Sequence, residues 1–218
     1  NPIFNNDFRK IIKKELKKNK LKINSISLDL IMDNPLHRLE KKDVDWLINQ
    51  LKQITKFFSV KRVTIPIEER SRFNNYIEKN NSLKNLKKFY DKLANKTKLS
   101  IESDLSPESL NFLFKKKAFK KLGLLLDLGN TRSHGFKIEE FVNLFPNKIY
   151  GIHIKYRPLF YSKTSKLKNN YHELKIVIQN LKKLKNCQDF TFQTYKSNDN
   201  YLRDMSHSVK NFNNHVQK

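Results

Sequence analysis

The feature that most constrains the fold is an alternation of short apolar runs with longer amphipathic stretches, repeated along the chain. Apolar runs bounded by turn residues predict strands, and apolar positions spaced at the helical period predict helices. Strands are expected at 23–30, 62–67, 98–103, 122–128, 148–155 and 189–195. Helices are expected at 7–19, 43–58, 82–96, 106–121, 137–145 and 172–185. Each strand–helix pair spans roughly 25 to 40 residues, which predicts βα units and a parallel sheet covered by helices.

Polar side chains gather at the C-terminal ends of the expected strands. They are Asp29, Glu68, Glu69, Glu102, Asp104, Asp127, His153, Lys155, Gln193 and Lys196. In parallel α/β proteins, functional sites are built at that edge of the sheet. One acidic residue at a strand end is commonly a helix cap, but six strands with this pattern favour a ring of side chains around one mouth. We therefore predict an α/β chain folded as a (β/α)8 TIM barrel.

This barrel is two strands short, because the sequence holds about six of the eight βα units. The chain begins at Asn1 without a methionine and enters a helix almost at once. We expect residues 1–218 to form a single domain, with the first two strands of the barrel upstream of residue 1. A flavodoxin-like sheet would accommodate six strands without that assumption, but no glycine-rich phosphate loop follows any strand.

The stretch LGLLLDLGNTRSHGF, residues 122–136, joins a buried run to a polar turn. The whole chain has four glycines, and all of them lie in or just after this stretch: Gly123, Gly129, Gly135 and Gly151. Glycine used so sparingly indicates positions where the backbone bends or where another group approaches closely. The apolar run delivers the carboxylate of Asp127 into this turn.

Four of the strand-end side chains form a candidate metal-binding set. The set consists of Glu102, Asp127, His153 and Gln193. Two carboxylates, an imidazole and an amide oxygen suit Mn²⁺, Mg²⁺, Co²⁺ or Zn²⁺. Taken singly, each has a structural explanation: the carboxylates as helix caps, with Ser106 and Thr131 as rival caps, and the imidazole as a core histidine. Their position on four successive strand ends favours the metal site.

Composition indicates the partners and the compartment. The net charge is +24, but the basic residues are mostly lysines spread along the helices as solvated faces, so nucleic acid is not the expected partner. No apolar run approaches the ~20 residues of a membrane span, and no signal-peptide core is present at the start. The single Cys187 excludes a disulfide framework and fits a reducing compartment, so we expect a cytoplasmic protein without a membrane partner. The sequence does not determine the oligomeric state, and a homo-oligomer is compatible with it.

The order of four runs resembles a known family. The runs are IESDLSPE, LLLDLGNTRSHGFKIEE, IYGIHIKYR and FTFQTYK. They are similar to the xylose isomerase-like TIM barrels of the sugar phosphate isomerase/epimerase superfamily, and the likeness covers most of the chain. The resemblance implies a divalent metal held by Glu102, Asp127, His153 and Gln193, and a sugar or sugar phosphate as the substrate.

The resemblance also implies roles for other residues. Glu102 would carry a proton, and Lys155 would lie by a developing oxyanion or serve as a base. The residues implied for substrate binding are Asn130, Arg157, Lys196 and Glu69.

Several departures from the family pattern accompany these roles. Gln193 stands where a glutamate base is usual, Tyr156 replaces an aspartate, Lys196 replaces an arginine, and the loop 157–170 lacks glycine. A one-base isomerisation through Glu102 fits the first departure. The main alternative is a catalytically weakened barrel that binds a sugar or has a structural role. A further alternative is an enzyme like the apurinic-site endonucleases, whose zinc cluster needs more imidazoles than His153 and His134 provide.

Overall fold

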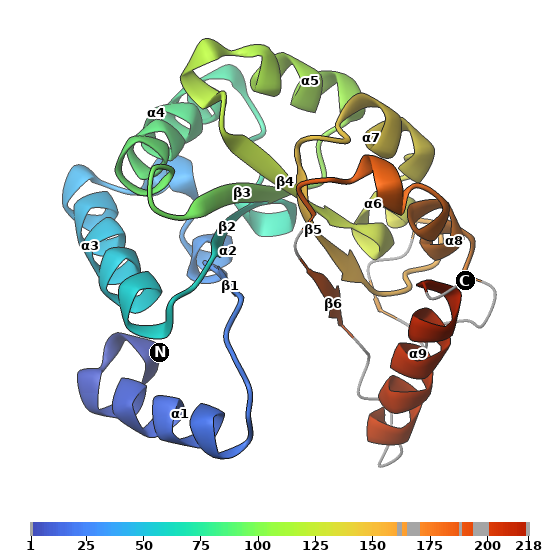
Figure 1. Cartoon of the computed structure of the whole chain (residues 1–218). Helices are drawn as coiled ribbons and strands as arrows, with labels where there is room; N and C mark the ends of the chain where they lie inside the picture. Colours follow the sequence, from blue (N-terminus) through green and yellow to red (C-terminus); the bar gives the residue numbers. More distant parts are fainter. Residues whose placement is uncertain (1, 161–162, 165–170, 188, 194–200, 217–218) are drawn as a thin grey trace. The chain divides into compact units, whose positions relative to one another are not determined.

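The computed structural model describes residues 2–160, 163–164, 171–187, 189–193 and 201–216 (Figure 1). The strands of this part of the chain are β1 (Ser25–Ser27), β2 (Arg62–Ile67), β3 (Lys98–Ser103), β4 (Leu122–Asp127), β5 (Ile149–Ile154) and β6 (Phe190–Phe192). They form one sheet in the order β1-β2-β3-β4-β5-β6, and the pairs β1/β2, β4/β5 and β5/β6 are parallel.

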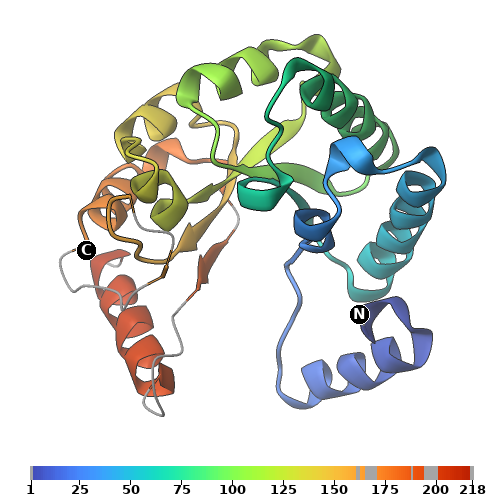
Figure 2. The ribbon, with the colours of Figure 1, turned by 180° about the vertical axis from the view of Figure 1, so that it is seen from behind.

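Helices separate each strand from the next. They are α1 (Asn6–Lys18), α2 (Leu30–Asp33), α3 (Lys41–Phe58), α4 (Tyr76–Leu93), α5 (Pro107–Lys115), α6 (Leu128–Ser133), α7 (Ile138–Leu144), α8 (His172–Gln179) and α9 (Tyr201–Val216). Figure 2 shows the same succession from behind. A strand order that follows the chain order is that of a (β/α)8 barrel, whereas a flavodoxin-like sheet has the order 2-1-3-4-5. The described residues thus hold six βα units of a barrel, as predicted.

The predicted strands at 62–67 and 98–103 are confirmed residue for residue. The first strand is shorter than predicted, because the chain passes into α2 at Leu30. Helices 106–121 and 172–185 are also shorter: each ends early and continues as a 3-10 turn, at Lys117–Phe119 and Leu181–Lys183.

By the density of its contacts the chain divides into two compact units. The first comprises Asn1–Ile101 and Lys116–Leu122, and the second comprises Glu102–Lys115 and Gly123–Lys218. In the first unit, every residue of β2 is buried, and α3 packs on α4. The hydroxyls of Thr64 and Ser100 hydrogen-bond at 2.9 Å, which satisfies two polar groups inside this core.

The second unit has its core between β4, β5 and the helices that pack on them. Helix α7 contacts α5, α6 and α8. An aromatic cluster fills this region, in which Phe145 lies edge-on to both Phe114 and Phe141. Toward the C-terminus, Phe212 of α9 packs against Phe190 and Phe192 of β6.

Gly123 in β4 lets the ring of Tyr150 lie directly on the backbone. A Cβ atom at this position would lie 2.2 Å from the ring, closer than any real contact. We expect Gly123→Ala to lower the free energy of unfolding by ~1–3 kcal/mol, because the overpacked ring must shift. Urea unfolding measures this. In a Tyr150→Leu background the same change should cost much less, and an equal cost in both backgrounds would contradict the close-packing explanation.

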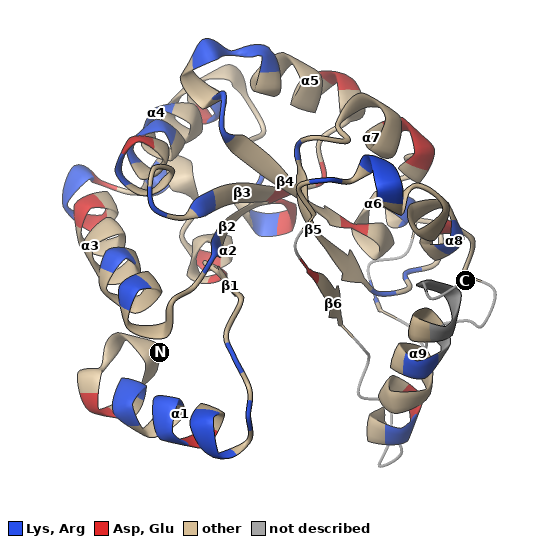
Figure 3. Cartoon of the chain, in the orientation of Figure 1, with Lys and Arg blue, Asp and Glu red and all other residues tan. Residues whose placement is uncertain are grey.

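Lys and Arg residues occur along the helices of both units (Figure 3). On α1, for example, Lys10, Lys13, Lys14, Lys17 and Lys18 are all exposed. This agrees with the solvated faces expected from the sequence. Among the described residues, no helix is long and apolar enough to cross a membrane.

Candidate functional site

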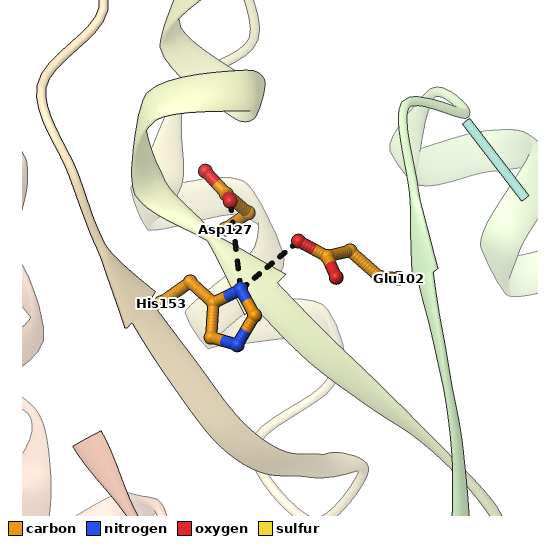
Figure 4. A group of neighbouring side chains, drawn as sticks. All are labelled: Glu102, Asp127 and His153. Atoms are coloured by element: carbon orange, nitrogen blue, oxygen red, sulfur yellow. Dashed lines mark hydrogen bonds and ion pairs between the residues drawn. The ribbon is translucent and has the colours of Figure 1, made fainter. Parts of the chain in front are cut away.

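Three of the predicted metal ligands come together in the second unit. Glu102, Asp127 and His153 each offer one ligating atom, and these atoms lie within 4.8 Å of one another. Nδ1 of His153 is 3.1 Å from Oε1 of Glu102 and 3.7 Å from Oδ2 of Asp127. Figure 4 shows both carboxylates facing the same ring nitrogen. The three residues are only 4–6% exposed.

The strands place these side chains by simple geometry. Asp127 is the last residue of β4, and it is the register partner of His153 in β5. Paired residues on parallel strands point to the same face, so the carboxylate and the imidazole are neighbours. Glu102 stands next to the end of β3. Each strand is therefore buried by its apolar residues and carries its polar residue at or next to its C-terminal end.

Asp127 has a second, structural role. Its Oδ1 accepts a hydrogen bond from the backbone N–H of Asn130 at 2.8 Å, which caps the N-terminus of α6. The sequence offered capping and metal binding as rival explanations for this residue. The cap uses Oδ1 and leaves Oδ2 facing His153, so capping does not exclude the predicted role in metal binding.

The ionisation of the cluster follows from burial and charge. Burial raises the pKa of Glu102 above its usual value, and the hydrogen bond and charge of His153 oppose this rise without cancelling it. Burial would also raise the pKa of Asp127, but His153 and Lys155 outweigh it and hold that pKa at about 2. Burial would lower the pKa of His153, but Asp127 and Glu102 outweigh it and raise that pKa to about 9. In the metal-free site at neutral pH, Asp127 is therefore anionic and His153 is cationic.

This ionisation predicts how the stability of the metal-free protein depends on pH. The pKa of His153 rises from 6.5 to about 9 on folding, so its stabilising effect is complete below pH 6.5 and is lost as the pH rises through about 9. We expect the melting temperature in the presence of a chelator to fall over this range, by an amount equivalent to roughly 3 kcal/mol. His153→Gln should remove most of that slope. A slope unchanged in the variant would mean that another group causes it.

Lys155 completes the cluster. It is 7% exposed, and its Nζ lies 2.7 Å from Oδ2 of Asp127. Lys155 directly follows β5 and is two residues beyond His153, so both side chains share a face. The sequence predicted Lys155 at the site, but it did not predict this ion pair.

Gln193 and Asn130 lie beside the cluster along the backbone. The N–H of Gln193 donates to the carbonyl of Ile154 at 3.0 Å, which continues the β5/β6 register and places Gln193 next to Lys155. Gln193 is half-buried, and its role as a metal ligand stays a prediction. Asn130 is buried in the first turn of α6, and its backbone N–H donates the capping hydrogen bond to Asp127. Its role in substrate binding also stays a prediction.

Three further residues were predicted to bind substrate: Arg157, Glu69 and Lys196. Nε of Arg157 donates to Oγ1 of Thr164 at 3.5 Å. Glu69 is exposed, has a positive φ of 47°, and belongs to the first unit. Lys196 lies outside the described residues. Their roles stay predictions.

Two ion pairs of the second unit were not expected from the sequence. Nε2 of His134 lies 3.7 Å from Oδ2 of the buried Asp104, and its Nδ1 lies 2.9 Å from the carbonyl of Asn130. Arg132 of α6 pairs with Glu173 of α8. Asp104 directly follows β3 and was predicted among the polar residues at strand ends, but its contact with His134 was not predicted. No local pattern links Arg132 to Glu173.

Known proteins were compared with the chain by sequence and by structure. The sequence matches no family model, and no curated protein matches it. A solved structure of a xylose isomerase domain protein from Planctomyces limnophilus is similar, with a TM-score of 0.74 and 11% identity over 96% of this chain and 83% of that chain.

Two further solved structures are similar over most of the chain. L-ribulose 3-epimerase has a TM-score of 0.70 and 15% identity, over 94% of this chain and 78% of that chain. The IolI protein, solved with a bound zinc atom, has a TM-score of 0.67 and 14% identity, over 90% of this chain and 77% of that chain. At these identities the likeness shows the fold alone, a TIM barrel, and proteins of the kind that the sequence motifs resemble share it.

Proposed function

We propose that this chain is a divalent-metal-dependent isomerase or epimerase of a sugar or sugar phosphate. The observation that carries the proposal is the convergence of Glu102, Asp127 and His153 within 4.8 Å at the ends of successive strands. Structurally similar proteins include L-ribulose 3-epimerase and a 3-keto-D-glucoside 4-epimerase from E. coli. One of them, the IolI protein, carries zinc.

The donor set fits a divalent cation. Two buried carboxylates and an imidazole nitrogen that come together are typical ligands for Mn²⁺, Co²⁺ or Zn²⁺. Gln193, which follows β6 and pairs along the backbone with the end of β5, would add an amide oxygen. Glu102, Asp127, His153 and Gln193 would hold the metal. A bound cation would polarise the carbonyl of an open-chain sugar.

The chain's own residues would supply the proton transfer. Glu102 would take the proton from the carbon beside the carbonyl and return it to the former carbonyl carbon, while the hydroxyl proton passes from one substrate oxygen to the other. Lys155 would place a positive charge near the substrate oxygens. Asn130 would contact sugar hydroxyls, and Arg157 would contact a hydroxyl or a phosphate. Because Gln193 cannot take up a proton, a single carboxylate base favours aldose–ketose isomerisation over two-base epimerisation.

One observation favours the alternative of a sugar-binding barrel with weakened activity. The ammonium group of Lys155 already contacts Asp127 and neutralises part of the charge that would attract a metal. The endonuclease alternative has less support. Within the described residues, one group of three or more His, Cys, Asp and Glu side chains comes together, and such an enzyme needs a multi-metal cluster.

The test combines metal binding with proton exchange. The protein is stripped with a chelator, and its melting temperature is recorded with added Mn²⁺, Co²⁺ and Zn²⁺. The metal-loaded protein is then incubated in D₂O with a panel of aldoses, ketoses and their phosphates, and deuterium at the carbon beside the carbonyl is followed by NMR. Metal-dependent deuterium incorporation supports the proposal. Metal binding without exchange on any substrate would favour the sugar-binding alternative.

A further inference from the structure

Lys155 is held in place from three directions within the second unit. Its ammonium contacts Oδ2 of Asp127 at 2.7 Å. Its carbonyl accepts a hydrogen bond from the hydroxyl of Tyr171 at 2.8 Å. Its side chain lies over Gly129, where an added Cβ would come within 2.6 Å of the Lys155 Cγ. Gly129 therefore makes room for the side chain of Lys155, and the surrounding residues fix the ion pair between Lys155 and Asp127.

The two oxygens of Asp127 have different partners. Oδ1 is used by the backbone N–H of Asn130, which caps α6. Oδ2 faces Nδ1 of His153 and Nζ of Lys155. A cation between Asp127 and His153 would contact Oδ2, because Oδ2 is the oxygen that faces the imidazole, whereas Oδ1 accepts the hydrogen bond of the helix cap. The ammonium group and the metal would thus compete for one oxygen.

We propose that Lys155 is the counter-ion of the metal-free site and that it leaves Asp127 when a divalent cation binds. This inference rests on the proposed metal site. A buried carboxylate without a positive partner is costly, so the ammonium stabilises the empty site. The lysine side chain is a flexible stem of four carbons, so Nζ can move while the hydrogen bond from Tyr171 keeps the backbone in place. Metal binding would then both fill the cluster and free an ammonium group for substrate oxygens.

The first test measures Mn²⁺ affinity by titration calorimetry. Lys155→Met removes the competing charge and keeps a side chain of similar length over Gly129. Its Mn²⁺ affinity is expected to rise by ~10-fold or more, because a like charge next to the cation is lost. The matched control is Lys137→Met, which removes one positive charge from an exposed position of the same unit. Its affinity should equal that of the wild type.

A second measurement uses the wild-type protein and does not depend on the folding of a variant. Lysines are acetylated briefly with and without Mn²⁺, and labelling of Lys155 is quantified by mass spectrometry. The released amine is expected to react several-fold faster when Mn²⁺ is bound, whereas labelling of Lys137 should not change. Labelling of Lys155 that stays the same or falls would overturn the inference.

The outcomes separate this inference from the proposed function. If neither the wild type nor Lys155→Met binds Mn²⁺, Co²⁺ or Zn²⁺, the metal site itself is wrong, and the inference fails with it. If the wild type binds metal and Lys155→Met binds it equally or more weakly, the metal site stands and the competition is wrong. Tighter binding by Lys155→Met, together with faster labelling of the wild type, supports both.

Discussion

Replacing Asp127 by asparagine is expected to lower the affinity for Mn²⁺ by at least ~100-fold, since even residues that only support metal ligands change affinity by 10- to 100-fold. Asp127 presents Oδ2 to the cluster from a buried position, and its pKa of about 2 keeps it anionic at any working pH. Asparagine has nearly the same shape but no charge. Titration calorimetry on chelator-treated protein measures the loss.

The same substitution should keep the α6 cap, but it should cost some stability, because it leaves the buried ammonium group of Lys155 without its carboxylate partner. Asparagine is as good an N-cap as aspartate, so its side-chain oxygen can still accept the hydrogen bond from the N–H of Asn130. Asp127→Ala, in contrast, removes both the cap and the ligand, and it should cost an additional ~1 kcal/mol of stability. Comparing the two variants separates the structural role of Asp127 from its chemical role.

Ser106→Ala provides a matched control for the cap. Oγ of Ser106 accepts a hydrogen bond from the N–H of Ser109 at the start of α5, in the same unit and away from the cluster. This variant should lose stability comparable to the loss of the α6 cap while keeping the wild-type affinity for Mn²⁺. If it also lost metal affinity, the effect of Asp127→Ala would have to be attributed to stability.

The strands were predictable because their burial leaves a strong pattern. β2 and β4 are buried at every position. β4 therefore appears in the sequence as an apolar run that ends at Asp127, and β2 as a short run rich in β-branched residues. Helices α6 and α9 were not predicted. α6 has six residues and includes Gly129, so it is too short to show a helical period. α9 is long but mostly polar, and among its side chains that the structure describes only Phe212 is buried.

The cluster was partly predictable for the same reason. Glu102, Asp127 and His153 each end or nearly end an apolar run, and parallel strands bring such ends to one edge. The contacts of the individual oxygens were not predictable. Oδ1 of Asp127 accepts the hydrogen bond of the α6 cap and Oδ2 contacts Lys155, and this depends on how one carboxylate is oriented. Arg132 and Glu173 are 41 residues apart in the sequence, and their pairing depends on how helices α6 and α8 pack.

Glu102→Gln is expected to lower the rate of proton exchange by ~10²–10⁴-fold, the usual contribution of a general base. Glu102 is the buried carboxyl group of the cluster whose pKa is raised, because burial outweighs the stabilising charge of His153. Glutamine keeps an oxygen that can contact a cation but cannot take up a proton. The rate of deuterium incorporation at the carbon beside the sugar carbonyl measures the effect, and Mn²⁺ affinity should fall less than in Asp127→Asn.

Glu108→Gln is the control, since this exposed glutamate of α5 lies in the same unit and should leave both quantities unchanged. The two site variants distinguish a ligand from a base because they affect different quantities. Asp127→Asn should act through metal affinity, so excess Mn²⁺ should restore part of the exchange rate. Glu102→Gln should resist rescue by metal, since the missing function is proton transfer. If saturating Mn²⁺ restored full exchange to Glu102→Gln, the base would have to be another group, and Lys155, freed from Asp127 by the metal, would be the first to test.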